Sequence, residues 1–405
     1  MRVSTFRDTP PIMPERGDTA AGGAASRAAA DARGRSRADE PQQRVWTING
    51  RFLTQRMTGV QRYAREIVLE LDRMIAQGHP LTRSLSVELV VPAAAPGLPG
   101  LTAIRVRSVP GLTGHLWEQL TLARVARGGI LSLGNTSTLL RRRQIVCIHD
   151  LNVFLFPQSY SRSFRLLYRI VLPLLGRLSR RVVTVSRFSS AAIVEAGVAR
   201  ADKVTIAPNG HDHVRRWQHS SASDANPHPD TVVVLGSLAP HKNVATLLRI
   251  APDLMRHGLR LAIVGNRDTK IYGDAKLDRA GEAALWLGPI TDEALAALLS
   301  RSLCLAFPSL MEGFGLPPIE AMALGCPVVV SDRASLPETC GDAALYASAL
   351  APDEWLAQIL RLQRDTDLRR EMIQRGRARA ETYSWRASAE VFLRAMADVD
   401  GETAS

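Results

Sequence analysis

The stretch PSLMEGFGLPPIEAMALGCPVVVSD, residues 308–332, carries the strongest fold signal in the chain. It follows an apolar run at residues 303–307 and passes through a Gly-Phe-Gly loop before it reaches two consecutive prolines. Proline is favoured at the first positions of a helix and glycine just after its end, so residues 319–324 are predicted to form a short helix that stops at Gly325. The stretch therefore predicts a strand, a glycine loop and a helix N-terminus in direct succession.

Such a corner suits a phosphorylated nucleotide, because backbone N–H groups and the positive end of the helix dipole both attract phosphate. Glu320, in the first turn of the helix, is predicted to lie beneath the nucleotide, since a carboxylate can accept two hydrogen bonds from the hydroxyls of a ribose. Glu312, ahead of the loop, is predicted to point across a cleft toward the group that the diphosphate carries. An ordinary strand–helix corner with two solvated glutamates would share these residues.

Glu312 and Glu320 form an E-x7-E pair within EGFGLPPIEAMALGCPVV, and this stretch resembles the signature of the family 4 retaining glycosyltransferases, the group 1 glycosyltransferases. The resemblance covers about residues 45–399. It implies an α/β fold in which two Rossmann-like domains face each other across a cleft (GT-B), with a C-terminal helix that crosses back to the N-terminal domain. It also implies that the loop and the helix start bind the donor, through Gly313, Phe314, Gly315 and Leu316.

The composition is that of a soluble globular protein. The chain has 405 residues, 46% of them hydrophobic, and a mean hydropathy of −0.03, which allows two domains with full cores. The chain has no run of about 18 uncharged apolar residues, so no membrane-spanning helix is predicted. The acidic residues and prolines near the start argue against a secretory signal. The four cysteines lack metal-ligand spacing, so they are expected to be buried thiols of a cytoplasmic protein.

Positive charge gathers in the first half of the chain. Residues 45–210 contain 22 Lys and Arg against 8 Asp and Glu, whereas residues 211–405 contain 21 against 25. This imbalance predicts that the first half faces an anionic surface or substrate, although a genome-wide bias toward arginine would produce the same excess. Aromatic residues are only 5% of the chain and do not alternate with basic ones, so no nucleic-acid partner is expected.

The first half alternates predicted strands and helices. A strand at residues 45–49 is followed by a turn at Gly59 and a helix, and later strands lead to His149 and Asp150. Alternation of this kind predicts a parallel sheet whose ligands bind beyond the carboxyl ends of the strands. The resemblance to family 4 glycosyltransferases implies that Gly59 and Asp150 lie on the acceptor side of the site. It also implies that His149 matches a strand-end histidine that lines the catalytic cleft.

Residues 161–181, SRSFRLLYRIVLPLLGRLSRR, combine an apolar face with six arginines. A helix buried in the domain and a helix that lies in a membrane interface would share this pattern. We favour the buried helix. The nearby arginines at 141–143 slightly favour the alternative, a peripheral contact with an anionic membrane.

The second domain is predicted to open with a strand at residues 231–235 and the stretch GSLAPHKNVATLL. Lys242, at the start of the next helix, is expected to balance the charge of a departing diphosphate. In the resemblance an arginine often stands near the position of Ser237, which is assigned to donor binding here. The resemblance also implies that the turn after Gly288 contacts the nucleobase through backbone atoms, which makes Pro289 and Ile290 the expected base contacts.

The domain boundaries follow from these elements. Residues 1–44 have little apolar content and are predicted to be a disordered tail. We expect an N-terminal acceptor domain at 45–210, a polar linker at 211–230, a nucleotide-sugar-binding domain at 231–385, and a returning helix at 386–399.

Together these features predict a retaining transfer of a hexosyl unit, of the mannosyl or glucosyl type, from a nucleotide-diphosphate sugar to a glycan or polyprenyl-linked acceptor. His149 and Glu312 are the expected catalytic residues, and cell-surface polysaccharide synthesis at the inner face of the plasma membrane is the expected setting. No metal or other cofactor is expected, because the chain shows no Asp-x-Asp pair of the kind that a metal-dependent transferase would have. The alternatives are a non-hydrolysing sugar-nucleotide epimerase and a non-catalytic nucleotide-sugar-binding regulator.

Overall fold

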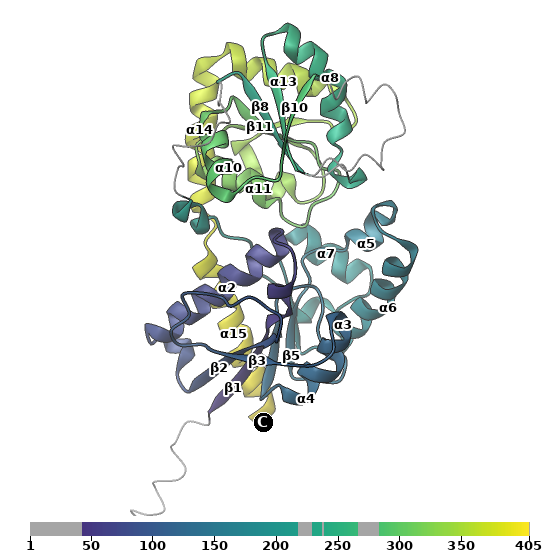
Figure 1. Cartoon of the computed structure of the whole chain (residues 1–405), viewed down its shortest axis with the longest axis vertical. Helices are drawn as coiled ribbons and strands as arrows, with labels where there is room; N and C mark the ends of the chain where they lie inside the picture. The colour runs from purple at the N-terminus through teal and green to yellow at the C-terminus, as the bar shows by residue number, and fades with distance from the viewer. Residues whose placement is uncertain (1–42, 218–228, 237–238, 266–282, 405) are drawn as a thin grey trace, which may run out of the picture. The chain divides into compact units, whose positions relative to one another are not determined.

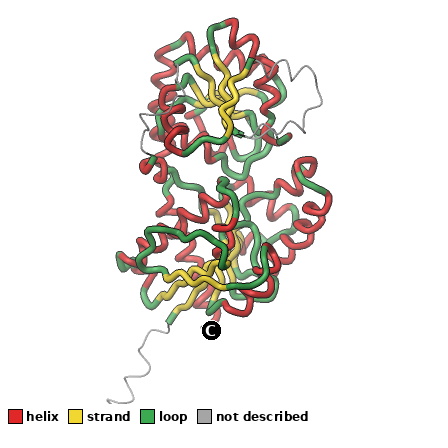
Figure 2. Tube along the Cα trace, in the orientation of Figure 1, coloured by secondary structure: helices red, strands yellow, loops and turns green. Residues whose placement is uncertain are grey.

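A computed structural model of the chain describes residues 43–217, 229–236, 239–265 and 283–404. Residues 1–42 of the expected tail lie outside this set. The described chain is built on two separate parallel sheets, drawn in Figure 2 as yellow strands wrapped by red helices.

The first sheet has seven parallel strands in the order β3-β2-β1-β4-β5-β6-β7. They are β1 (Arg44–Asn49), β2 (Leu85–Pro92), β3 (Arg105–Val109), β4 (Gly129–Ser132), β5 (Gln144–Cys147), β6 (Arg181–Thr184) and β7 (Val204–Ile206). Trp46 of β1 pairs with Val87 on one side and Gly129 on the other. The strand order reverses between β1 and β4, and this reversal is the position where sheets of this kind bind ligands.

The second sheet has six parallel strands in the order β10-β9-β8-β11-β12-β13. They are β8 (Thr231–Leu235), β9 (Arg260–Val264), β10 (Ala284–Gly288), β11 (Cys304–Phe307), β12 (Val328–Ser331) and β13 (Leu345–Ala347). Leu305 of β11 pairs with Val233 of β8 and with Val328 of β12. Both sheets therefore follow the Rossmann order, and the expected α/β fold with two Rossmann-like sheets is confirmed.

Helices connect the parallel strands, because such strands cannot be joined by tight hairpins. The first half contains α2 (Gly59–Ala76), α3 (Gly114–Leu116), α4 (Ala123–Val125), α5 (Asn152–Leu155), α6 (Arg162–Leu178) and α7 (Arg187–Glu195). The second half contains α8 (Val244–Arg256), α10 (Asp292–Arg301), α11 (Leu316–Ala323), α12 (Leu336–Cys340), α13 (Pro352–Arg364), α14 (Thr366–Glu381) and α15 (Trp385–Ala404).

The last helix, α15, lies beside α2 against the first sheet, as Figure 1 shows. The Asp400 carboxylate accepts hydrogen bonds from Arg44, at 2.5 Å, and from the indole N–H of Trp46, at 3.0 Å, both in β1. Ser388 donates to the carbonyl of Pro208. These contacts confirm the expected return of a C-terminal helix to the first half of the chain.

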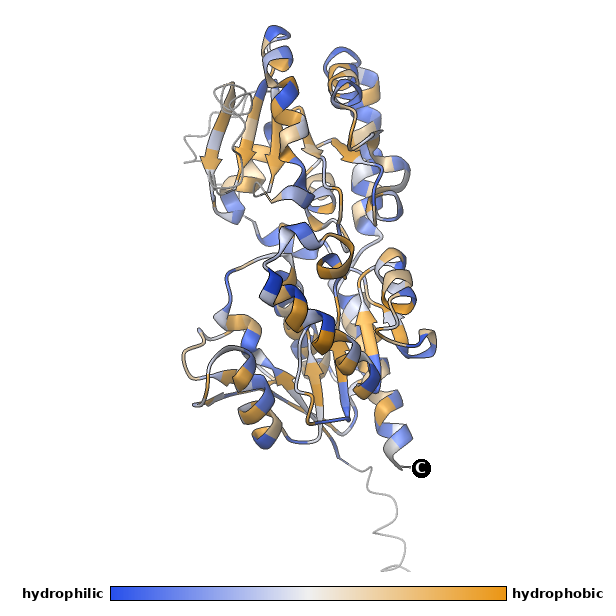
Figure 3. Ribbon diagram, turned by 90° about the vertical axis from the view of Figure 1, so that its right-hand side faces the viewer, coloured by the Kyte–Doolittle hydropathy of each residue, from blue (hydrophilic) through white to orange (hydrophobic). Residues whose placement is uncertain are grey.

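The cores follow from strands that are apolar on both faces, as parallel sheets between helix layers require. Figure 3 shows the inner strands of both sheets mostly in the hydrophobic colour, whereas the edge strand β3, RVRSV, contains two arginines. Trp46, Tyr63 and Trp385 are fully buried in one cluster, and Trp355 is fully buried in another. The four cysteines are buried and free, as expected.

Helix α6 is buried less than we predicted. Gly176, near its C-terminal end, packs so closely that a Cβ would lie 2.0 Å from the Val198 carbonyl oxygen, whereas Leu166 and Ile170 are 64% and 54% exposed. The favoured prediction of a core helix therefore holds only where the helix approaches Val198. No helix among the described residues is long and apolar enough to cross a bilayer.

Candidate active site

The candidate site is a cavity of about 500 Å³ at the carboxyl ends of strands from both sheets. The structure brings ten of the twelve predicted site residues to its lining: Gly59, His149, Asp150, Lys242, Glu312, Gly313, Phe314, Gly315, Leu316 and Glu320. Ser237 lies outside the described residues, and Ile290 packs partly buried against the core without lining the cavity. The neighbouring Pro289 is exposed, so this turn does not form part of the cavity wall.

His149 follows β5, and its side chain is buried beside Tyr63, whose ring centroid lies 4.8 Å away. The Nε2 atom is 2.9 Å from the carbonyl oxygen of Leu133, and because a carbonyl only accepts, Nε2 carries the proton. Burial lowers the pKa of His149 to about 4. The imidazole is therefore neutral at neutral pH and offers a ligand no positive charge.

Asn135 holds the backbone at His149 in place. It adopts a left-handed conformation with a φ of 62°, which asparagine tolerates better than most residues, and its side-chain oxygen accepts the His149 N–H at 2.7 Å. Sequence reasoning missed this residue, although the Gly134-Asn135 pair is a turn signal.

Gly313 brings the loop after β11 into direct contact with the end of β5. A Cβ at Gly313 would lie 2.6 Å from the carbonyl oxygen of His149, so only glycine leaves room there. Ser186 donates a 2.6 Å hydrogen bond to the Gly313 carbonyl, and Ser189 donates to the His149 carbonyl at 2.9 Å. Turns from the two sheets therefore touch through their backbones.

Three charged groups share the next part of the cavity wall. Lys242 Nζ lies 2.7 Å from Glu312 Oε1. We had expected this lysine to be free to bind a diphosphate, but in the structure it is paired with a carboxylate. The helix also begins later than predicted, at Val244, because Asn243 adopts a left-handed φ of 52° between Lys242 and α8. Burial raises the pKa of the Asp150 carboxyl, and the nearby charge of Glu312 raises it further.

Glu320, only 5% exposed, is bonded to a histidine that sequence reasoning missed. The indole N–H of Trp385 donates to His213 Nδ1 at 2.9 Å, so the proton of this ring is on Nε2, which donates to Glu320 Oε1 at 2.8 Å. His213 is fully buried in the short 3-10 turn Asp212–Arg216, although it falls in the predicted polar linker. Nothing in the linker composition could have indicated this contact.

Arg62 is a second missed residue of the cavity wall. It makes a bidentate pair with Asp292 at 2.6 and 2.9 Å, and its Nε lies 3.6 Å from Glu320 Oε1. Its guanidinium also stacks over Trp217 at 5.2 Å. A cation in the first turn of α2 opposes the helix dipole, and that mismatch was the available sequence signal.

The start of α11 has the predicted geometry. Gly315 adopts a left-handed φ of 91° as the N-cap, and the two prolines occupy the first helical turn. Because proline carries no N–H, the amides of Gly315 and Leu316 are the donors that this turn can offer an anion. The Phe314 side chain turns away to pack edge-on against Tyr383, with 5.1 Å between ring centroids, so its contribution to a ligand would come from its backbone.

Acidic pairs of the Asp-x-Asp type do occur elsewhere in the chain, at residues 365–367 and 398–400. The first caps α14 through Asp365, and the second includes Asp400, bonded to Arg44. Neither pair lines the cavity. In the part of the chain that the structure describes, no group of three His, Cys, Asp or Glu residues is placed to hold a metal.

The sequence profile of the glycosyl transferases group 1 matches residues 215–379, which include the Glu312–Glu320 corner. O-antigen chain mannosyltransferase B of Escherichia coli is 30% identical over 256 residues, a stretch that covers 60% of this chain and 67% of that protein. O-antigen chain mannosyltransferase RfbU of Salmonella typhimurium is 25% identical over 237 residues, or 56% of this chain and 63% of its relative. The chain belongs to the group 1 glycosyl transferases.

Solved structures agree with the fold. A sucrose-phosphate synthase from Thermosynechococcus elongatus superposes with a TM-score of 0.65 at 18% identity, and the match covers 89% of this chain and all of that one. Anabaena HepE in complex with UDP superposes with a TM-score of 0.63 at 18% identity, over 88% of this chain and 100% of the other. At this level of identity the likeness establishes the GT-B architecture.

Proposed function

We propose that this protein is a retaining hexosyltransferase, of the mannosyl or glucosyl type, that uses a nucleotide-diphosphate sugar and a glycan or polyprenyl-linked acceptor. The observation that carries the proposal is the Lys242–Glu312 pair at the glycine corner, in one cavity with His149 and Asp150 from the other sheet. Membership of the group 1 family supports the transferase class, and the names of the two O-antigen relatives support a role in cell-surface polysaccharide synthesis.

The geometry suggests how the donor would be held. A diphosphate beside Lys242 would compete with Glu312 for the ammonium group, which would free the carboxylate to face the sugar. The amides of Gly315 and Leu316 would add neutral donors at the positive end of α11. Glu320 would hold the ribose while His213 and Arg62 keep its carboxylate in place.

We propose that the leaving diphosphate is stabilised by Lys242 and these backbone amides, without a metal. The test is a panel of nucleotide sugars in which nucleoside diphosphate release is scored with and without EDTA. Release that persists in EDTA is the expected result, and activity that EDTA abolishes and magnesium restores would overturn this part of the proposal. Conversion of a donor to its epimer without an acceptor would instead favour an epimerase.

A variant pair separates the donor site from general charge effects. Lys242→Gln should weaken binding of the cognate nucleoside diphosphate at least tenfold, because a charge-assisted hydrogen bond contributes ~1.5–3 kcal/mol. Arg301→Gln removes the same charge from an exposed position at the end of α10 and should bind normally. Equal affinities for the two variants in calorimetric titration would argue against Lys242 as a donor ligand.

The acceptor side is proposed to work at an anionic membrane surface, through the exposed face of α6. Leu166, Ile170 and Leu174 are 64%, 54% and 37% exposed there, and Arg162 and Arg169 on the same helix are exposed beside them. An apolar strip with basic flanks suits insertion at the headgroup level.

Liposome flotation tests this contact. Leu166→Ser with Ile170→Ser should abolish flotation with anionic vesicles. The matched pair Met255→Ser with Leu285→Ser, which are 60% and 55% exposed in the second half of the chain, should leave flotation unchanged. If the floated fraction of the protein changes neither with lipid charge nor with the α6 substitutions, the result would count against the proposal.

A further inference from the structure

A second cavity, of about 580 Å³, lies at the amino-terminal ends of strands of the first sheet, opposite the ends that line the candidate active site. Its lining includes Arg142, just ahead of β5, residues 178–181 from the last residue of α6 to the first residue of β6, and Lys203, just ahead of β7. At about 3.3 Å per strand residue, the start of β6 at Arg181 is roughly 17 Å from Ser186, which contacts the candidate active site. The second cavity is therefore a separate place on the molecule.

The charge of this lining is strongly positive. Five cationic side chains and two carboxylates contribute to it: Arg142, Arg177, Arg180, Arg181, Lys203, Asp202 and Glu402. One cation is already neutralised, because Arg181 pairs with Glu402 of α15. Asp202 is held by a bidentate pair with Arg200, which lies outside the lining.

The other cations lack such partners. Within the described residues, no carboxylate forms an ion pair with Arg142, Arg177 or Arg180. Lys203 donates to the carbonyl oxygens of Arg177 at 2.9 Å and Ser179 at 3.1 Å, contacts that fix its amine without cancelling its charge. Several like charges gathered at one cavity are unfavourable unless an anion joins them.

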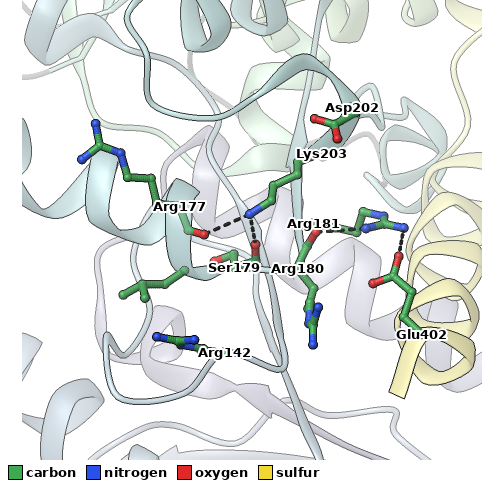
Figure 4. Close-up of a pocket in the computed structure, with 9 residues that line it drawn as sticks. Arg142, Arg177, Ser179, Arg180, Arg181, Asp202, Lys203 and Glu402 are labelled. Carbon is green, nitrogen blue, oxygen red and sulfur yellow. Dashed lines mark hydrogen bonds and ion pairs between the residues drawn. The ribbon is translucent and has the colours of Figure 1, made fainter. Parts of the chain in front are cut away.

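One of the residues that line the cavity, Ser179, has a hydroxyl group without a hydrogen-bond partner in the described part of the chain. The Ser179 side chain is fully buried, and its hydroxyl makes no hydrogen bond with any residue that the structure describes. Figure 4 shows Ser179 and the Lys203 amine at the middle of the cluster, with Arg142 and Arg180 on one side and Arg181 reaching toward Glu402. Buried hydroxyl groups are normally satisfied by protein, water or ligand.

We propose that this cavity binds a phosphate group with two or more negative charges, as in a diphosphate or a phosphomonoester. Guanidinium groups form forked hydrogen bonds with phosphate oxygens, and the lining has three more positive than negative side chains. The volume of about 580 Å³ leaves room for a small molecule larger than the phosphate group itself. The shared chemistry is that of a lipid headgroup or a soluble phosphorylated metabolite.

Calorimetric titration with pyrophosphate at low ionic strength tests the site, in a Lys242→Gln background that weakens binding at the candidate donor site. Arg142→Gln with Arg180→Gln should weaken binding at least tenfold, since both side chains are exposed and neither supports the fold through an ion pair. Arg83→Gln with Arg105→Gln removes two exposed charges from the same half of the chain and should bind pyrophosphate normally. Thermal unfolding checks that each variant is folded. Equal affinity in the two double variants would overturn the proposal.

A second arm identifies the source of the phosphate. Flotation with vesicles that contain phosphatidic acid in phosphatidylcholine should decrease in the Arg142/Arg180 variant, but not in the control, if the ligand is a lipid headgroup. Normal flotation together with lost pyrophosphate binding would assign the cavity to a soluble phosphate. Unchanged results in both arms would again overturn the site.

Discussion

Replacing Gly313 with alanine tests whether the two strand-end turns must touch for the site to work. The added Cβ would lie 2.6 Å from the His149 carbonyl oxygen and 3.1 Å from Asp150 Cβ, whereas ordinary contact begins near 3.4 Å. The His149 carbonyl is a backbone group that cannot rotate away, so the loop must shift by ~0.8 Å. Overpacking of this kind costs ~1–3 kcal/mol of stability. The same shift would lengthen the 2.6 Å hydrogen bond from Ser186 and displace the adjacent Glu312.

We expect Gly313→Ala to lower the free energy of unfolding by ~2 kcal/mol and turnover by about a hundredfold, because displacements of ~1 Å near reacting groups have effects of that size. Denaturant unfolding and nucleoside diphosphate release from the cognate donor measure the two effects. Gly97→Ala is the control, since a Cβ there meets nothing within 4 Å and its φ is not strained. Wild-type stability and turnover in Gly313→Ala would refute the steric reasoning.

Three further results are expected. Arg62→Met should lower the free energy of unfolding by ~1–2 kcal/mol, a modest loss because its partner Asp292 is 40% exposed; Arg62→Lys should recover part of it, and an unchanged denaturation midpoint would contradict this. Burial alone would raise the pKa of Asp72, but backbone amides at 102–104 lower it, so its stabilisation is present above a pH of about 4 and is lost as pH falls below that. Asp72→Asn should flatten the acid limb of a Tm-against-pH curve. The pH profile of turnover should show no inflection from His149 between pH 6 and 7, because its pKa is about 4; an inflection there that disappears in His149→Gln would be inconsistent with a buried neutral ring.

The sheets could be predicted because their signals are local. Residues 231–235, TVVVL, have three consecutive valines after the β-branched Thr231, and the predicted strand has the observed bounds of β8. The proline pair and Gly325 predicted both ends of α11 correctly to within a few residues. Buried parallel strands and helix caps leave marks in a few consecutive residues, so no tertiary knowledge was needed.

The missed features depend on residues far apart in the chain. His213 meets Glu320 across 107 positions, and Arg62 meets Asp292 across 230, distances over which composition carries no information. The pairing of Lys242 with Glu312 could not be predicted either, because it depends on how the β8 and β11 corners meet. The roles assigned to these residues in donor binding and catalysis stay predictions.

The bonds from Asp400 to β1 have a consequence for how this protein is made. Trp46 and Asp400 are separated by 354 residues, and at ~5–20 residues per second a ribosome needs roughly 20–70 s to cover that interval. Until then the first sheet has its strands but lacks α15, and the apolar surface that packs Tyr63 against Trp385 and Phe392 stays open. The half of the chain that the ribosome makes first is therefore completed only when α15 has been made, and its apolar surface stays exposed to water until then.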